Sequence, residues 1–499
     1  PGAKVASTPR NALFRNDGNW RFTDVTKQAG VGDTGFGLGV CAADYDNDGF
    51  VDLYVSNYGP NVLYRNNGDG TFRDATERAG VGLGKHVGAG VAFVDVDNDG
   101  HLDLFVANYI EDTLDRHQPH FHKGVPSYPG PLHHRPGSMV LFRNNGDGTF
   151  SDISREAGLA DLKGHGMGVV AADYDGDGDQ DLFVANDVQA NFLLRNDGTG
   201  KFTDVAVLAG TAFDLAGNVQ ASMGVDAADF DNDGLVDFHV TSYAGEFATL
   251  YRNLGGGLFE DATRATRAGE GTLPHVTWGN GFADFDNDGQ RDLFIACGHL
   301  DDNFHLRGGG GSTAFAVANV VLQNLGNSRF RNVSAQSGDG LKPVYSSRGA
   351  ALGDLDGDGD PDIVVLNSRE PPTLIRNDTS SGNHWLGVRL EGVESNRGGI
   401  GAHVKVHAGG AAWVDEVRSG RGYQSDFGPW LHFGLGKAAR VEKIEVRWPS
   451  GKVSTAADVA PNQTILLREG EPGFRVLPGS GEAAREGEAP AEPAASASR

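Results

Sequence analysis

Residues 39–49 read GVCAADYDNDG, and close copies of this stretch return five more times along the chain. The copies begin their aspartate clusters at Asp95, Asp173, Asp229, Asp284 and Asp354. Counted from Asp44, the successive spacings are 51, 78, 56, 55 and 70 residues. A base period of about 50 residues with insertions is typical of propeller blades or a similar repeat array.

Each repeat is predicted to contain four short β-strands. A Gly/Ala/Val run such as residues 88–94 forms the first strand, and an aspartate loop leads to an apolar second strand such as residues 103–108. The third and fourth strands are joined by an Asn-Gly or Asp-Gly turn, which is a strong hairpin signal. This hairpin occurs at residues 61–76 and again at 15–24, 143–152, 195–204, 252–261 and, degraded, 323–332.

A four-stranded sheet of this size cannot bury its own faces, so the units are expected to pack against each other in a ring. The predicted fold is all-β: a calcium-binding β-propeller followed by a small β-rich domain. Residues 11–26 supply only strands three and four, and the last unit ends after strand three at Asn377. We therefore expect one blade shared between the chain ends. Seven blades is the preferred count and six the alternative.

The strongest motif is D-x-D-x-D-G-x-x-D, which is present six times, and we number the copies loop 1 to loop 6 in chain order. The candidate metal ligands are Asp44, Asp46, Asp48, Asp52 (loop 1); Asp95, Asp97, Asp99, Asp103 (loop 2); Asp173, Asp175, Asp177, Asp181 (loop 3); Asp229, Asp231, Asp233, Asp237 (loop 4); Asp284, Asp286, Asp288, Asp292 (loop 5); and Asp354, Asp356, Asp358, Asp362 (loop 6). Ca²⁺ takes six to eight oxygen ligands, and the glycine permits the sharp turn that aims alternate carboxylates at one point. Up to six Ca²⁺ ions are predicted.

The alternatives to a calcium site of this type are ordinary turn residues, an EF-hand and a magnesium site. Aspartate and glycine also favour ordinary turns, but six intact copies are hard to explain by turn preference alone. The loop is shorter than an EF-hand, and strands rather than helices flank it. Magnesium fits less well, because it usually keeps several water ligands.

Composition supports a folded acidic protein. Of the 499 residues, 39% are apolar and 74 are glycine, and the mean hydropathy is −0.35. The formal charge is −25, which disfavours nucleic-acid binding because phosphate backbones are repelled. No apolar run is long enough for a membrane span. No signal peptide is seen at Pro1, although a mature chain would lack one, so the calcium loops are the basis for expecting a secreted, extracellular or periplasmic protein, with a cell-surface position as an alternative. A disulfide between Cys41 and Cys297, each placed in a predicted strand, is not expected.

The repeats resemble the FG-GAP/VCBS repeats of integrin-α-like propellers across residues 11–377. The C-terminal part resembles an ASPIC/UnbV domain on four blocks: residues 395–402 (SNRGGIGA), 416–423 (EVRSGRGY), 432–436 (HFGLG) and 446–451 (VRWPSG). Repeats followed by this domain are the arrangement of the cartilage acidic protein family. The resemblance implies an extracellular calcium-binding protein with an adhesion or interaction role.

The predicted domains are residues 1–380 for the propeller, 381–470 for the β-rich domain and 471–499 for a disordered low-complexity tail. Two insertions interrupt the repeat. Residues 109–138 carry five histidines and five prolines, and residues 298–319 carry a glycine-rich stretch. The candidate transition-metal ligands are Asp112, Asp115, His117, His120, His122, His133 and His134 in the first insertion, and His299, Asp301, Asp302 and His305 in the second. The prolines favour an extended path, so we expect the first insertion to cover one propeller face or touch a partner and to hold no transition metal.

No serine-hydrolase, zinc-protease, phosphate-loop or dinucleotide motif is present, so no catalytic residue is assigned. The favoured function is a secreted calcium-binding module that binds a protein or a glycan. One alternative is a metal-dependent enzyme, such as a polysaccharide lyase or a tailoring enzyme, that uses the histidine-rich insertion. Another is a structural component of an extracellular assembly.

Overall fold

The structure is a computed structural model that describes residues 9–84, 86–111, 119–303, 306 and 314–478. Nearly all regular elements are strands, which confirms the all-β prediction. Within the described ranges, no helix is long and apolar enough to cross a membrane.

Six repeat units, numbered like their loops, form antiparallel sheets. Unit 1 contains β3 (Phe36–Ala43), β4 (Asp52–Tyr58), β5 (Val62–Asn66) and β6 (Phe72–Asp74). Unit 2 contains β7 (Val87–Val94), β8 (Asp103–Glu111), β11 (Arg135–Asn144) and β12 (Phe150–Asp152). Unit 3 contains β14 (Gly166–Ala172), β15 (Asp181–Gln189), β16 (Phe192–Asn196) and β17 (Phe202–Asp204). Unit 4 contains β19 (Val225–Ala228), β20 (Asp237–Val240), β21 (Thr249–Asn253) and β22 (Phe259–Asp261). Unit 5 contains β23 (Thr277–Ala283), β24 (Asp292–Cys297), β25 (Val320–Asn324) and β26 (Phe330–Asn332). Unit 6 contains β27 (Ser347–Gly353), β28 (Asp362–Asn367) and β29 (Thr373–Ile375). Short strands β13 (Lys163–Gly164) and β18 (Gln220–Ala221) extend β11 and β15, and one pair, Tyr58 with Val87, joins the sheets of units 1 and 2.

Four one-turn helices, which the sequence analysis missed, follow fourth strands: α1 (Thr26–Ala29), α2 (Thr76–Ala79), α3 (Ala206–Ala209) and α4 (Thr263–Thr266). In α2, the Asp74 carboxylate accepts the Thr76 N–H at 2.9 Å, and Gly80 ends the turn at φ 80°. The Thr76 hydroxyl in turn accepts the N–H of Leu63 on strand three. The Asp-x-Thr-x-x-Ala-Gly pattern of α1 and α2 was the available signal, because the aspartate accepts an N–H at the start of the turn and the glycine adopts the left-handed conformation at its end.

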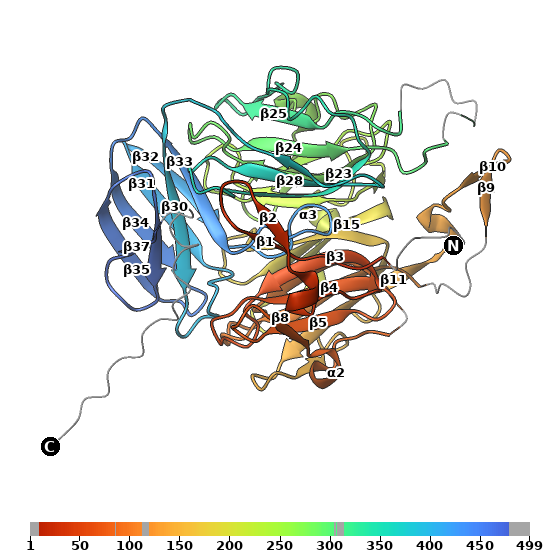
Figure 1. The fold of residues 1–499 in the computed structure, drawn as a ribbon, viewed down its shortest axis with the longest axis horizontal. Helices are drawn as coiled ribbons and strands as arrows, with labels where there is room; N and C mark the ends of the chain where they lie inside the picture. The colour runs from red at the N-terminus through yellow and green to blue at the C-terminus, as the bar shows by residue number, and fades with distance from the viewer. Residues whose placement is uncertain (1–8, 85, 112–118, 304–305, 307–313, 479–499) are drawn as a thin grey trace.

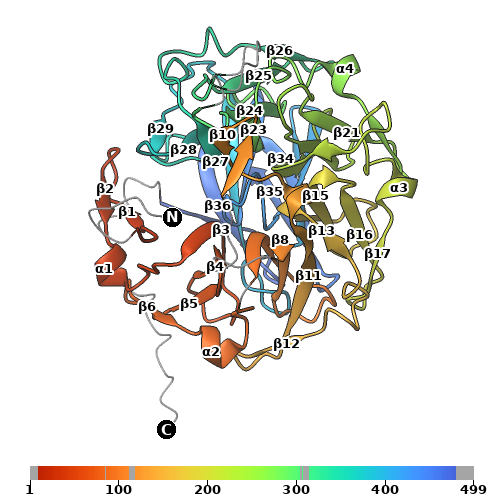
Figure 2. The ribbon, with the colours of Figure 1, turned by 90° about the vertical axis from the view of Figure 1, so that its right-hand side faces the viewer.

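Viewed down the axis, the inner strands of the units surround the centre of the ring, which we call the channel, and the hairpin of β1 (Phe14–Asn16) and β2 (Phe22–Asp24) lies at the rim between units 6 and 1 (Figure 2). One repeated asparagine explains this position. Asn144 donates from its amide to the Tyr45 carbonyl of the preceding unit at 2.8 Å, and Asn16 donates to the Leu355 carbonyl of unit 6 at 2.7 Å. The hairpin therefore occupies its own place in the ring.

The expected shared blade is wrong. In the described part of the chain, β1 pairs only with β2, and the sheet of unit 6 ends at β29. The ring contains six units and one two-stranded hairpin, so the blade number depends on whether the hairpin is counted. Since the hairpin brings no inner strands, β3 keeps Phe36, Leu38 and Val40 exposed, whereas β7, β14 and β23 are buried throughout.

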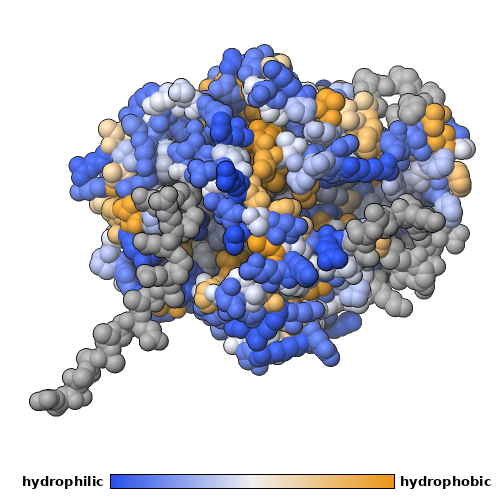
Figure 3. All heavy atoms as spheres, in the orientation of Figure 1, coloured by the Kyte–Doolittle hydropathy of each residue, from blue (hydrophilic) through white to orange (hydrophobic). Residues whose placement is uncertain are grey.

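Most of the surface is hydrophilic, with apolar residues gathered in the middle of the view (Figure 3).

The C-terminal domain consists of two four-stranded sheets. One contains β33 (Trp430–Gly436), β30 (His384–Glu391), β36 (Gln463–Arg468) and β37 (Arg475–Val476), and the other contains β32 (Ala411–Glu416), β31 (His403–Ala408), β34 (Val441–Arg447) and β35 (Val453–Val459). Leu386, Val404, Ile444 and Trp448 are buried in its core. Strand β37 lies in the stretch assigned to a disordered tail and pairs with β36. Residues 479–499 of that stretch lie outside the described residues.

The C-terminal domain packs on one face of the ring (Figure 1). Inner strands β3, β7, β14, β19, β23 and β27 each run into an aspartate loop at their C-terminal ends, and the domain contacts this face. Residues 418–428, which we call the axial segment, enter the channel. Its Ser419 carbonyl accepts the Ala171 N–H at 3.1 Å, and Gly422 pairs with Val225.

Candidate functional site: the aspartate loops

In loop 1, backbone N–H groups hold the first and the ninth carboxylate with two hydrogen bonds each. Asp44 accepts the Asp48 N–H at 3.0 Å and the Gly49 N–H at 2.8 Å. Asp52 accepts the Tyr45 N–H at 3.2 Å and the Asn66 N–H at 2.7 Å. Gly49 adopts φ 94°, which a residue with a Cβ adopts only under strain. The loop is thus folded around its first and ninth residues.

The other loops repeat this arrangement. The N–H of the sixth residue, glycine in each case, donates to the first aspartate at 2.7–3.0 Å: Gly100 to Asp95, Gly178 to Asp173, Gly234 to Asp229, Gly289 to Asp284 and Gly359 to Asp354. In loops 1 to 5, carboxylate oxygens from three aspartates lie within 4.8 Å of one another. These groups are Asp44/46/48, Asp95/97/99, Asp173/175/181, Asp229/231/237 and Asp284/286/292.

The third loop position carries the clearest sign of a cation site. Asp46, Asp97, Asp175 and Asp231 each keep a buried Oδ1 that accepts no hydrogen bond. A buried carboxylate oxygen without a donor is unfavourable, and a bound cation would satisfy it. Oxygen-only donor sets of this density suit Ca²⁺. The residues therefore fit the calcium that the sequence predicts.

The electrostatics of the loops agree with this fit. Burial, together with the neighbouring aspartates, raises the pKa of Asp44 to about 6 and that of Asp95, Asp229 and Asp284 to about 7. Without a cation these carboxyls retain protons close to neutral pH. A divalent cation favours the charged carboxylates, so metal and protons compete for the same oxygens.

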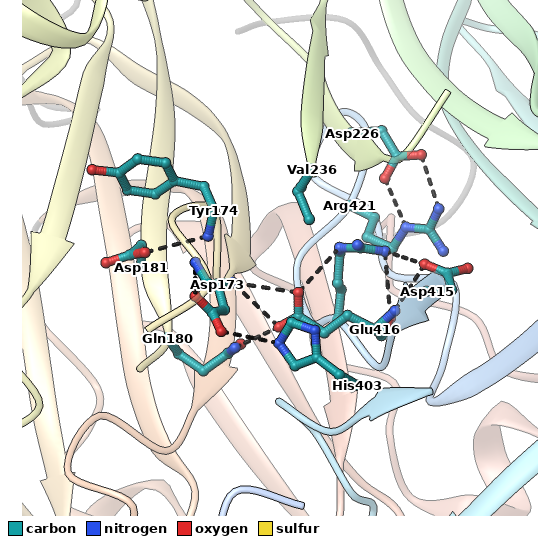
Figure 4. Close-up of polar contacts among 12 residues, drawn as sticks. Asp173, Tyr174, Gln180, Asp181, Asp226, Val236, His403, Asp415, Glu416 and Arg421 are labelled. Atoms are coloured by element: carbon teal, nitrogen blue, oxygen red, sulfur yellow. Dashed lines mark hydrogen bonds and ion pairs between the residues drawn. The ribbon is translucent and has the colours of Figure 1, made fainter. Parts of the chain in front are cut away.

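Loop 3 departs from this pattern (Figure 4). Burial acts to raise the pKa of Asp173, but His403 and Arg447 outweigh it and the pKa is lowered. Arg447 Nη2 lies 2.7 Å and His403 Nε2 lies 3.2 Å from Asp173 Oδ2. Both side chains come from the C-terminal domain, on β34 and β31. Asp173 is thus the one first-position aspartate with an ion pair to that domain among the described residues.

The domain touches four more loops through backbone or asparagine atoms. Asn47 Oδ1 of loop 1 accepts the Arg397 N–H at 2.8 Å. In loop 5, His432 Nε2 lies 2.6 Å from Asn287 Oδ1, and Trp413 Nε1 donates to the Gly289 carbonyl at 2.9 Å. Gly100 of loop 2 and Gly359 of loop 6 lie so close to Glu394 and Trp385 that a Cβ would overlap them.

Loop 4 is different. No hydrogen bond or ion pair joins it to the domain in the part of the chain that the structure describes. Asp229 instead lines a cavity of about 210 Å³ that loop 4 shares with Asp173 of loop 3 and with Glu416 and Arg418 of the domain.

A buried charge network fixes the axial segment. Arg421 binds Asp226 with two hydrogen bonds, of 2.7 and 2.9 Å, and the Asp226 side chain is fully buried. Arg291 and Arg418 both pair with Asp415. Burial acts to raise the pKa of Asp415, but Arg291, Arg418 and Arg421 hold it near 2. Arg421 and Arg291 therefore join the domain to units 4 and 5, whereas Arg418 pairs with Asp415 inside the domain.

The histidine-rich insertion covers the opposite face. Strands β9 (His120–His122) and β10 (Val125–Ser127) form a hairpin over the ring, followed by the short helix η2 (Pro131–His133) (Figure 2). His120 and His133 have ring centroids 4.7 Å apart. Asp112, Asp115 and His117 lie outside the described residues.

The second insertion meets the first. Asn303 donates to the Pro126 carbonyl at 2.8 Å. His299 Nε2 lies 3.2 Å from the Tyr243 hydroxyl, and Asp302 pairs with Arg369. His305 lies outside the described residues. The metal-competent groups of loops 1 to 5 consist of aspartates alone.

Both cysteines are free and buried, as expected from the sequence. The Cys41 sulfur lies 3.1 Å from the Ser419 hydroxyl and 3.1 Å from an Asp426 oxygen, so the axial segment covers it. Cys297 lies in β24, away from that segment. The sequence carried no signal for these contacts, because the partners are separated by more than 300 residues without a shared period.

Ring, loops and capping domain together define a β-propeller of aspartate-loop repeats. Residues 5–55, 44–106, 134–184, 173–240, 229–295 and 299–365 match the FG-GAP-like repeat, and the chain belongs to this family. Residues 348–385 match the FG-GAP repeat and residues 392–473 match ASPIC and UnbV, which confirms both resemblances drawn from the sequence.

The chain is similar to cartilage acidic protein 1. It is 28% identical to the Homo sapiens protein over 379 residues, covering 73% of this chain and 51% of that protein. Identity to the Xenopus tropicalis protein is 26% over 442 residues, covering 84% and 62%. The chain thus spans about half the length of the curated relatives it matches.

The chain also resembles solved structures. An Agrocybe aegerita protein that recognises non-reducing terminal N-acetylglucosamine has a TM-score of 0.39, with 18% identity over 74% of this chain and 88% of that one. The Dos1 propeller has a TM-score of 0.33, with 11% identity over 84% and 91%.

Proposed function

We propose that loops 1 to 6 bind Ca²⁺ through the aspartates predicted from the sequence. The observation that carries this is the buried, unpaired Oδ1 of Asp46, Asp97, Asp175 and Asp231. Equilibrium dialysis against calcium, followed by elemental analysis, tests it. We expect up to six ions per chain. A protein that retains none at millimolar calcium would refute the proposal.

We further propose that the protein is secreted and acts as a binding or scaffold module for a protein or glycan partner. The family supports this, as does the cartilage named in its relatives. On the face opposite the loops, the histidine-rich insertion presents Phe121, Tyr128 and Leu132, each more than half exposed. Exposed apolar side chains on a projecting segment are suited to partner contact.

Screening against immobilised glycans and extracellular-matrix proteins tests this role. For a partner so found, Phe121→Ala with Leu132→Ala is expected to weaken binding by about tenfold or more, as for centrally placed apolar contacts. Leu208→Ala on α3 is the matched control, because this leucine is exposed but lies in unit 3, away from the insertion. Equal loss in both variants would contradict the proposed surface.

A further inference from the structure

The contact between the C-terminal domain and the propeller is built from the loops themselves. The accepting atoms include Asn47 Oδ1, Asp173 Oδ2, Asn287 Oδ1 and the Gly289 carbonyl. All four belong to the nine-residue motifs. A ligand that stabilises the loops in this conformation therefore also stabilises the surface on which the C-terminal domain docks.

The loops are also linked to one another. The Asn47 amide donates to the Gly100 carbonyl of loop 2 at 3.0 Å, and the Asn98 amide donates to Asp179 after loop 3's glycine at 2.9 Å. Asn232 bonds Gly289 in the same way. Without a cation, the four crowded carboxyl groups in each loop repel one another once they are ionised, which favours opening. Opening of one loop would thus disturb its neighbour as well as the docked domain.

The docked domain closes the channel. Ser419 contacts β3 through Cys41 and accepts the Ala171 N–H of β14, and Gly422 pairs with Val225 of β19. Tyr423 reaches Trp278 of β23, with ring centroids 5.1 Å apart. Phe427 packs with Ala350 and Leu352 of β27. One segment of the C-terminal domain therefore touches the inner strands around the ring.

We propose that calcium in the loops holds the C-terminal domain on the propeller, and that calcium removal releases the domain and withdraws the axial segment from the channel. The inference rests on the proposed calcium binding. A ligand favours the state to which it binds more tightly, and the docked state presents the folded loops. By reciprocity, docking strengthens calcium binding.

Cys41 reports the position of the axial segment. Its sulfur is covered by Ser419 and Asp426, whereas Cys297 is buried within unit 5 beside the Ile295 carbonyl. A maleimide pulse followed by peptide mass spectrometry measures both thiols in the unmodified chain. Bound calcium is measured on the same samples by elemental analysis.

With calcium, we expect both thiols to be protected. After EDTA, Cys41 labelling is expected to accelerate roughly 5- to 150-fold, the usual range of coupling between sites, while Cys297 stays protected. If Cys41 stays protected after verified calcium loss, the inference is wrong and calcium binding stands. If both thiols react together, calcium loss unfolds the propeller and the inference is wrong. If no calcium was bound at the start, the proposed function fails first.

A variant pair tests the docking contact with calcium present. Arg447→Ala removes the guanidinium that pairs with Asp173. We expect Cys41 labelling to rise about two- to fivefold, because the Arg447 side chain is 41% exposed and an ion pair this open to solvent contributes little. Arg440→Ala is the matched control, since Arg440 precedes the same strand and pairs only with exposed Asp458. Equal labelling in the two variants would overturn the role of Arg447.

Discussion

Loop 3 and loop 4 have the same aspartates at the same spacing but different surroundings. Burial raises the pKa of Asp229 to about 7, whereas His403 and Arg447 lower the pKa of Asp173. In the described residues, the C-terminal domain places two basic side chains beside Asp173 of loop 3 and forms no ion pair with loop 4, although both loops line the same cavity. Two copies of the same motif therefore differ in their electrostatics, because the single C-terminal domain contacts them differently.

The comparison of loops 3 and 4 presupposes that calcium stabilises every loop. A site at a hundred times its dissociation constant adds about 2.7 kcal/mol to folding. Removal of calcium by EDTA is therefore expected to lower the melting temperature strongly, because several loops lose this contribution together. Differential scanning calorimetry with and without calcium measures it. An unchanged melting temperature after verified calcium removal would contradict the role of all six loops.

Unit 4 contacts the domain through the channel rather than through loop 4. Arg421→Ala leaves Asp226 buried with the Phe282 N–H as its remaining hydrogen-bond donor. Breaking a buried pair in this way typically costs about 3–5 kcal/mol. We expect a loss of that size in the free energy of unfolding, measured by urea titration. Arg421→Lys keeps the charge but not the two-pronged geometry and should recover part of it.

Features that depend on residues close together in the sequence could be predicted, whereas contacts between distant residues could not. Loops and hairpins are local: nine residues place Asp44 and Asp52, and Asn67 to Gly70 turn one strand into the next. The fold class and the clustered ligands were therefore accessible. Contacts such as Cys41 with Ser419 and Asp226 with Arg421 join a repeat to a single-copy domain. No period records such contacts, so the closed channel and the asymmetry of loops 3 and 4 required the structure.

The pH dependence of stability is a further test of the contrast between loops 3 and 4. Asp229 has a folded pKa of about 7 against an ordinary value of 3.8, so the folded apo-protein binds more protons than the unfolded chain between these values. Stability without calcium must then fall as the pH rises from about 4 to 7, by at most about 1.4 kcal/mol per pH unit for each such carboxyl. EDTA should therefore destabilise less at pH 5 than at pH 7.5. Melting temperatures in EDTA across this range measure the slope, and a rise with pH would contradict the raised pKa values.

Asp173 should contribute nothing to that slope while Arg447 is present, because its pKa is already low. Arg447→Ala removes one of the two basic groups and should make loop 3 behave more like loop 4. The direct effect on stability is expected to be small, below about 1 kcal/mol, because the guanidinium side chain is 41% exposed and the Gly176 and Gly178 N–H groups still bind Asp173. The informative measurement is the pH slope of the apo-protein, which should become steeper than in Arg440→Ala. If the slopes are equal, the basic side chains on loop 3 do not set the charge of Asp173, and the contrast between the two loops lies in burial alone.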